Sequence, residues 1–229
     1  MSTLDANPAR VDAALTAAAI PTARRGAERT RRLSTREREL YRWILDRFAH
    51  ATPPDANAIS ECAQSLGLDH VAALAALARE DLVHFDDEGA ILVAYPFSAR
   101  PRGHRVLIDN DRSVEAMCAI DALGIAPMLN LPIEVTSRDP ATGTEIWVRL
   151  HPGEGAWWEP ETAVVLAGSS RCEGPSFRGC CDVLNFFESR ESVDQYVREH
   201  TEVKGLPISI ADAIEVGRAI FGDISLEEA

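Results

Sequence analysis

The sequence predicts an α+β fold, in which an N-terminal winged-helix-like module of three helices is followed by a mixed or antiparallel sheet with packed helices. Three observations lead to this prediction. Apolar residues recur at helical spacing in the first part of the chain. Short runs rich in Val, Ile and Leu, separated by turn residues, follow them. Two amphipathic helical segments then close the chain.

Residues 1–33 are rich in Ala, Arg and Thr and show no sustained apolar face. We therefore predict a mobile or loosely helical N-terminal extension there. The first regular helix is predicted in STRERELYRWILDRFAH, because Ser34 and Glu37 have the spacing of a capping box and an apolar stripe follows them. The pair Pro53-Pro54 stops this helix.

The next segment predicts the remainder of a winged-helix-like domain over residues 34–95. A short helix around Cys62 ends at Gly67, which suits the position just after a helix. Asp69 can cap the following helix. The runs LVHF and AILVAY, separated by DDEG, predict a β-hairpin that forms the wing.

Residues 96–229 are predicted to form the second domain. HRVLID indicates a strand, Ser113 is a plausible N-cap for a helix that carries Cys118, and Pro127 lies near the end of that helix. A hairpin is predicted in LPIEVTSRDPATGTEIWVRL, another strand in TAVVLA, and a loop passing into a strand in CCDVLNFFES. SRESVDQYVREH and SIADAIEVGRAIFG are the closing helices.

The composition predicts a soluble, cytoplasmic globular protein. Hydrophobic residues make up 46% and charged residues 26% of the 229 residues. The sequence has no apolar run of about 18 residues, so no membrane span is predicted. No basic segment precedes the Ala-rich stretch near the N-terminus, so a secretory signal is not expected. The net charge of −13 argues against broad binding to phosphate backbones, although residues 1–50 carry ten Arg and six acidic residues.

The five cysteines, at positions 62, 118, 172, 180 and 181, have no disulfide-framework or zinc-ribbon spacing. Cys118 and Asp121 lie three positions apart in an apolar run, where a helix would place them on one face. Cys118 could be a small hydrophobic residue of the core, and Asp121 could face solvent at the edge of the core. Several thiols with one embedded acid fit a soft metal held by thiolates better.

Four segments carry a resemblance to a known family. AMCAIDALGIAPML resembles the signature helix of the alkylmercury (organomercurial) lyases, and CCDVLNFFES resembles their second cysteine motif. EGAILVAYPFSARPRGHRVLID is similar to the strand pair that precedes the family's signature helix, and GLPISIADAIEVGRAIF to its closing helix. The similarity runs in family order from about residue 40 to residue 222.

The resemblance implies cleavage of the carbon–mercury bond by protonolysis, which releases a hydrocarbon and Hg(II). It implies that Cys118, Asp121 and Cys181 are the catalytic residues and hold the mercury. Cys181 is chosen because the family motif has its cysteine five residues before the first Phe, here Phe186. Cys180 stays open as the second thiolate in place of Cys181, or as a further mercury ligand.

The resemblance also implies what the reaction needs besides the protein. No organic cofactor is expected. Low-molecular-weight thiols would act as co-substrates that remove Hg(II), or a mercuric reductase could accept it. The chain could be a monomer or a homodimer.

Two other readings remain open at this point. The protein could be a non-catalytic thiolate-binding protein for Hg or Cu, or a metal-sensing winged-helix regulator that binds DNA. Asp121 favours the enzyme, because a ligand site gains nothing from a desolvated acid. The candidate recognition helix, DHVAALAALARED, offers Arg79 as its only cation, so nucleic-acid binding is not expected. We expect the winged-helix module to be a scaffold that covers the active site.

Overall fold

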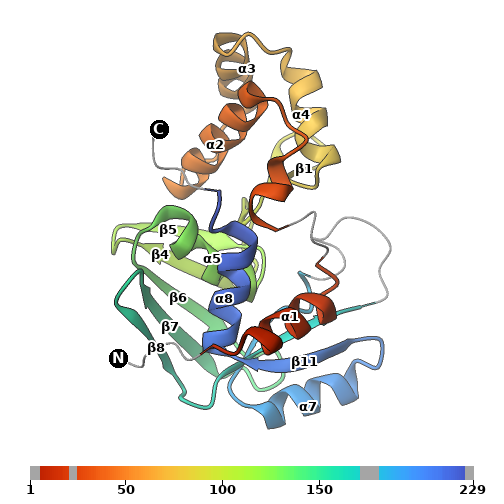
Figure 1. Ribbon diagram of the computed structural model, residues 1–229, viewed down its shortest axis with the longest axis vertical. Helices are drawn as coiled ribbons and strands as arrows, with labels where there is room; N and C mark the ends of the chain where they lie inside the picture. The colour runs from red at the N-terminus through yellow and green to blue at the C-terminus, as the bar shows by residue number, and fades with distance from the viewer. Residues whose placement is uncertain (1–5, 21–24, 171–180, 225–229) are drawn as a thin grey trace.

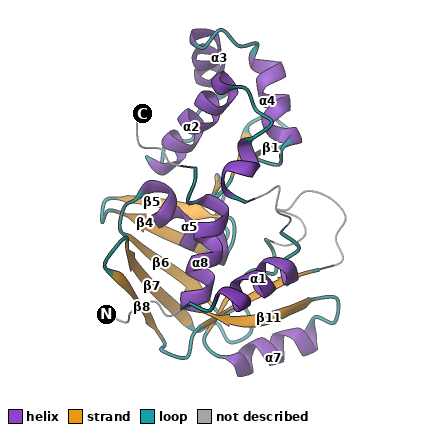
Figure 2. Ribbon diagram, in the orientation of Figure 1, coloured by secondary structure: helices purple, strands orange, loops and turns teal. Residues whose placement is uncertain are grey.

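The computed structural model describes residues 6–20, 25–170 and 181–224 of the chain. Within these residues, helices pack on two antiparallel sheets (Figures 1 and 2). The larger sheet has eight strands in the order β1-β2-β3-β5-β4-β6-β7-β8, and the smaller has three in the order β10-β9-β11. The predicted α+β class is therefore confirmed. No helix in the described residues is long and apolar enough to cross a membrane.

The elements have the following bounds. The helices are α1 (Pro8–Ala17), the 3-10 helix η2 (Gly26–Thr30), α2 (Thr35–Ala49), α3 (Ala56–Ser65), α4 (His70–Arg79), α5 (Ala119–Leu129), α7 (Arg190–Glu199) and α8 (Ile210–Phe221). The strands of the larger sheet are β1 (Val83–Phe85), β2 (Ile91–Ala94), β3 (Phe97–Ser98), β4 (His104–Ile108), β5 (Arg112–Ala116), β6 (Ile133–Arg138), β7 (Glu145–His151) and β8 (Gly155–Glu159). Those of the smaller sheet are β9 (Val164–Ser169), β10 (Phe186–Phe187) and β11 (Lys204–Ser209).

The local signals of the N-terminal module are confirmed. Ser34 accepts a hydrogen bond from the Glu37 N–H, and the Glu37 carboxylate accepts one from the Ser34 N–H, which completes the predicted capping box of α2. Asp69 caps α4, and Gly67 has a φ of 66° directly after α3. The hairpin β1–β2 also forms, but β2 continues through β3 to β5 in the larger sheet. The β1–β2 hairpin therefore forms one end of the eight-stranded sheet.

The N-terminal residues include a packed helix, so the prediction that residues 1–33 lack a core face is wrong for α1. Ala14 and Leu15 are buried, and the Asn7 N–H donates to the Asp212 carboxylate at 2.8 Å. In Figure 1, α1 lies beside α8 and β11, which it contacts. The buried face consists mainly of alanine, and such a short stripe gives almost no periodic signal in the sequence.

Helices α5 and α8 cross at very short range. α5 is apolar nearly all round, as expected for a helix buried between a sheet and another helix. A Cβ atom added to Gly217 would lie 2.9 Å from the backbone nitrogen of Gly124, and one added to Gly124 would lie 2.3 Å from the Phe221 ring. The two glycines therefore allow the two backbones to touch.

Replacing Gly217 by alanine is expected to destabilise the protein by about 1–2 kcal/mol. Overpacking costs about 1–3 kcal/mol, and the backbone of Gly124 cannot move away as a flexible side chain could. The gain in helix propensity of about 1 kcal/mol offsets part of this cost. Urea unfolding measures the difference, with the exposed Ala219→Ser as control on the same helix. A Gly217→Ala variant as stable as the control would contradict this packing.

His104 is a buried imidazole on β4. Its Nδ1 lies 2.9 Å from the Ser137 hydroxyl, and its ring centroid lies 5.9 Å from that of Phe186. Burial lowers the pKa of His104 to about 4. Because the unfolded side chain has a pKa of about 6.5, the unfolded chain binds more protons between these two values. The free energy of unfolding therefore decreases as the pH falls from about 6.5 to about 4.

Acidification from about pH 7 to about pH 5 is expected to cost the wild-type protein about 2 kcal/mol more unfolding free energy than it costs a His104→Gln variant. Glutamine cannot titrate in this range, so the comparison removes the contribution of the histidine alone. Denaturant unfolding of both proteins at both pH values gives the two differences. The same pH dependence in both would show that His104 does not carry this penalty.

Candidate active site

Cys118 stands at the junction between β5 and α5. The prediction that Ser113 caps its helix is wrong, because Arg112–Ala116 is a strand paired with β4 and β3. The helix begins at Ala119, and Cys118 is its N-cap residue with an extended backbone. Val114 and Ala116 point inward along the strand, and this two-residue alternation is too short to separate from the apolar helix that follows.

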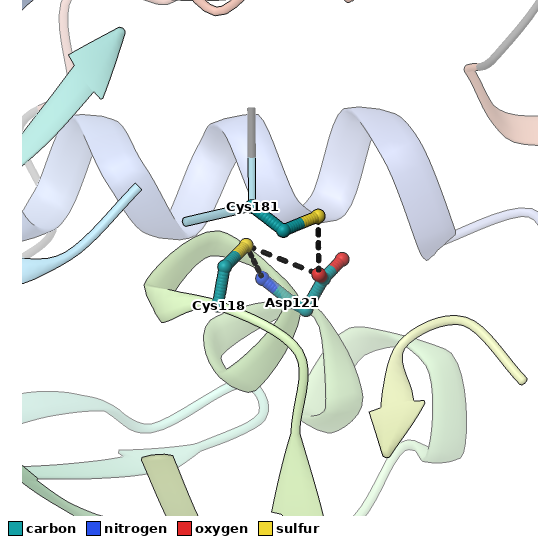
Figure 3. Close-up of side chains that lie close together, drawn as sticks. All are labelled: Cys118, Asp121 and Cys181. Carbon is teal, nitrogen blue, oxygen red and sulfur yellow. Dashed lines mark hydrogen bonds between the residues drawn. The ribbon is translucent and has the colours of Figure 1, made fainter. Parts of the chain in front are cut away.

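The N-cap position brings the thiol of Cys118 onto Asp121 in the first turn of α5 (Figure 3). The Cys118 Sγ–H donates to Asp121 Oδ2 at 3.0 Å, and the Asp121 N–H donates to the Cys118 sulfur at 3.4 Å. Both side chains are almost fully buried, with 1% and 5% of their surface exposed. The predicted proximity of the two residues is correct, but the cause is a helix cap rather than a shared helical face.

Cys181 reaches the same carboxylate from a turn that precedes β10. Its sulfur lies 3.9 Å from Asp121 Oδ2, and it is 4% exposed. The turn is held by a hydrogen bond of 2.8 Å from the Ala119 N–H to the Leu184 carbonyl and by an ion pair between Arg102 and Asp182. Figure 3 shows the sulfurs of Cys118 and Cys181 directed at the same oxygen of the Asp121 carboxylate.

The structure thus brings together the three residues that the sequence singled out. One ligand atom each from Cys118, Asp121 and Cys181 lies within 4.8 Å of the others, close enough to hold one metal ion. Cys180 and Cys172 lie outside the described residues. Cys62 is half-buried in α3 and packs against the hydrophobic core.

Burial controls the protonation of this cluster. It raises the pKa of Asp121 to about 6, while a hydrogen bond from Cys118 favours the charged form. It raises the pKa of the Cys118 thiol to about 12, so near neutral pH this thiol keeps its proton and donates it to Asp121. Two sulfurs that share a neighbouring carboxylate can bind a soft metal and move a proton beside it.

Two residues near the site carried no signal in the sequence. The hydroxyl oxygen of Tyr95 lies 3.8 Å from the Cys181 sulfur, and the Arg29 guanidinium lies 4.9 Å from the Tyr95 ring centroid. Tyr95 stands in a turn between two short strands, where an aromatic residue looks like ordinary core. Arg29 belongs to an arginine-rich stretch that is typical of an exposed basic segment.

Comparison with known proteins decides what this cluster belongs to. The sequence model of the alkylmercury lyases matches residues 97–222, which is more than half of the chain and contains Cys118, Asp121 and Cys181. The chain belongs to the alkylmercury lyase family. The resemblance seen in its motifs is therefore confirmed, and the protein is a lyase of the class that cleaves carbon–mercury bonds in organomercurials.

Individual relatives agree with this assignment. The alkylmercury lyase of Streptomyces lividans is 26% identical over 181 residues, which cover 79% of this chain and 81% of the relative. That of Staphylococcus epidermidis is 29% identical over 137 residues, which cover 59% of this chain and 61% of the relative. The crystal structure of the mercury-bound form of MerB2 has the same fold, with a TM-score of 0.71 and 20% identity over 86% of this chain and 95% of that chain.

Proposed function

We propose that this alkylmercury lyase acts by protonolysis with Cys118 and Cys181 as mercury-binding thiolates and Asp121 as the proton carrier. The observation that supports this best is one carboxylate oxygen close to two buried sulfurs, 3.0 Å from that of Cys118 and 3.9 Å from that of Cys181. A soft R–Hg⁺ group prefers sulfur ligands. The carbon that leaves needs a proton, and a buried carboxyl close to both sulfurs can supply it.

The first step is capture of the substrate R–Hg–X. Asp121 accepts the Cys118 proton along the existing hydrogen bond of 3.0 Å, and the thiolate forms an S–Hg bond as X leaves. The first proton departs with X as HX. The Asp121 N–H, at the positive end of α5, stabilises the sulfur as its proton leaves.

The second step breaks the carbon–mercury bond. Cys181 gives its proton to Asp121 and forms the second S–Hg bond, which raises the electron density on the carbon. Asp121 then delivers this proton to the carbon, and R–H leaves. In the overall reaction, R–Hg–X and two protein thiols give R–H, HX and one Hg(II) bound by the two sulfurs, so that atoms and charge balance.

The last step is release of Hg(II). The proposal needs no organic cofactor, but it needs low-molecular-weight thiols to displace the two protein sulfurs, or a mercuric reductase to accept the ion. We therefore place the reaction in the reducing cytoplasm, where such thiols are abundant. The related MerB2 has been crystallised in a mercury-bound form, which supports mercury as the bound metal here.

We also propose that residues 34–95 form a winged-helix-like scaffold, and residues 96–229 the catalytic domain. The order of α2, α3, α4 and the β1–β2 hairpin fits a winged helix. The hydroxyl of Tyr95, the last residue of this module, lies 3.8 Å from the Cys181 sulfur, and its carbonyl accepts the Tyr41 hydroxyl of α2 at 2.9 Å. The module therefore supplies part of the wall of the site.

The proposed function is tested by product formation. The protein is incubated with phenylmercuric acetate and an excess of a small thiol, and benzene is quantified by gas chromatography. We expect many benzene molecules per protein molecule, and none above the background without protein. Tight binding of mercury without any benzene would contradict the proposal and would point to a non-catalytic thiolate-binding protein.

A further inference from the structure

The two sulfurs of the site are held in different ways. Cys118 is fixed by its place at the N-terminus of α5, where its sulfur accepts the Asp121 N–H at 3.4 Å. Cys181 lies in a turn outside any helix or strand. The Ala119 N–H bonded to the Leu184 carbonyl and the Asn185 side-chain amide bonded to the Asp182 carbonyl hold the backbone of that turn. These bonds do not act on the Cys181 side chain. The position of this sulfur beside Asp121 is set by the side-chain groups that contact it, of which the Asp121 carboxylate at 3.9 Å is one.

Tyr95 provides such a group. It is 2% exposed and lies in the turn between β2 and β3, and its hydroxyl oxygen is 3.8 Å from the Cys181 sulfur. A hydroxyl can accept a hydrogen bond from a thiol and can donate one to a thiolate. It therefore stays paired with Cys181 in both forms that the sulfur takes during the reaction.

Tyr95 is itself held on several sides. Its carbonyl accepts the Tyr41 hydroxyl at 2.9 Å, and its N–H donates to the Leu82 carbonyl at 3.1 Å. The Arg29 guanidinium lies over its ring at 4.9 Å from the centroid, and the His84 ring meets it edge-on at 5.9 Å. A ring packed in this way cannot turn its hydroxyl away from the sulfur without moving its neighbours.

We propose that Tyr95 is a positioning residue that holds the Cys181 sulfur beside Asp121, and that Arg29 keeps the Tyr95 ring in place. The proposal rests on the proposed function of Cys181 as the second mercury ligand. Through Tyr95, the N-terminal segment and the helical module fix the geometry of the second thiolate.

The role of Tyr95 can be measured through the affinity with which the two sulfurs together hold one Hg(II) ion. A pre-positioned second sulfur binds the ion as an intramolecular ligand at high effective concentration. A Tyr95→Phe variant keeps the ring and loses the hydroxyl, so it removes one of the contacts that hold the Cys181 sulfur in its present rotamer. We expect the variant to give up Hg(II) to a competing small thiol at about a tenfold lower thiol concentration.

The test uses Hg(II) alone as the probe and a double-mutant cycle. Retention of one equivalent of Hg(II) is measured against increasing small thiol for the wild type, Tyr95→Phe, Cys181→Ala and the double variant. We expect Tyr95→Phe to lower retention when Cys181 is present and to have no effect when it is absent. Tyr196→Phe, which removes the same atom from α7, is the matched control and should match the wild type.

Two results would overturn the proposal. One is a Tyr95→Phe variant that retains Hg(II) as well as the wild type, and the other is an equal loss with and without Cys181. If Tyr95→Phe does not fold, Arg29→Lys is measured in the same cycle, with a smaller expected loss that also needs Cys181. An equal loss of retention with and without Cys181 would contradict the proposal for this variant too.

The cycle is independent of catalysis. Absence of benzene from the wild type would overturn the proposed function, whereas the retention of Hg(II) would still show whether Tyr95 acts through Cys181. If the wild type turns over, Tyr95→Phe should also lower kcat for benzene formation about tenfold and leave KM within about twofold, because substrate capture depends on Cys118.

Discussion

Replacing Cys118 by serine is expected to lower benzene formation from phenylmercuric acetate by at least about a thousandfold. Serine fits the N-cap position of α5 as well as cysteine does, so the helix and the fold should be unchanged. Its oxygen, however, is a hard ligand with little affinity for mercury. The rate of benzene release under excess thiol measures the effect.

Cys181→Ser should have a loss of similar size, because one S–Hg bond leaves the carbon attached. Cys180→Ser tests the choice between the two adjacent cysteines, and we expect it to stay active. Cys62→Ser, in α3, is the control for loss of a thiol elsewhere. Full activity in Cys181→Ser together with inactivity in Cys180→Ser would transfer the role of second ligand to Cys180.

Replacing Asp121 by asparagine should separate mercury binding from bond cleavage. Asparagine has nearly the same shape, but it cannot take a proton from a thiol or give one to a carbon. We expect benzene formation to fall by about 10²–10⁴-fold, while one Hg(II) ion still binds to the two sulfurs. Gas chromatography and retention of Hg(II) on a desalting column give the two readouts.

The exposed Asp111→Asn, in the turn before β5, controls for the loss of one carboxylate. An Asp121→Asn variant that forms benzene at the wild-type rate would show that the proton reaches the carbon by another route. A variant that loses both benzene formation and Hg(II) binding would assign Asp121 to the metal rather than to the proton.

The sequence predicts well those parts of the fold whose cause is local. The capping box of Ser34 and Glu37, the cap at Asp69 and the glycine at position 67 each depend on a few neighbouring residues, and each is confirmed. The start of α5 is wrong because the strand and the helix share one apolar run. In that run, burial on both sides of the helix hides the change of period.

Parts of the site depend on contacts between distant segments, and these are harder to predict. Cys118 and Asp121 are three residues apart, so their contact follows from spacing. Cys181 comes close to them only through the tertiary fold, and the sequence indicated it only through the family resemblance. Tyr95 and Arg29 reach the site through tertiary packing, which leaves no pattern in either local segment.

The most direct test of the account is a single turnover in heavy water. Phenylmercuric acetate is mixed with one equivalent of protein without any small thiol, and the organic product and the mercury on the protein are both quantified. We expect about one benzene per protein, carrying one deuterium at the carbon that had held the mercury, with the Hg(II) retained by Cys118 and Cys181. Recovery of intact phenylmercury from the protein, with no deuterated benzene, would contradict it.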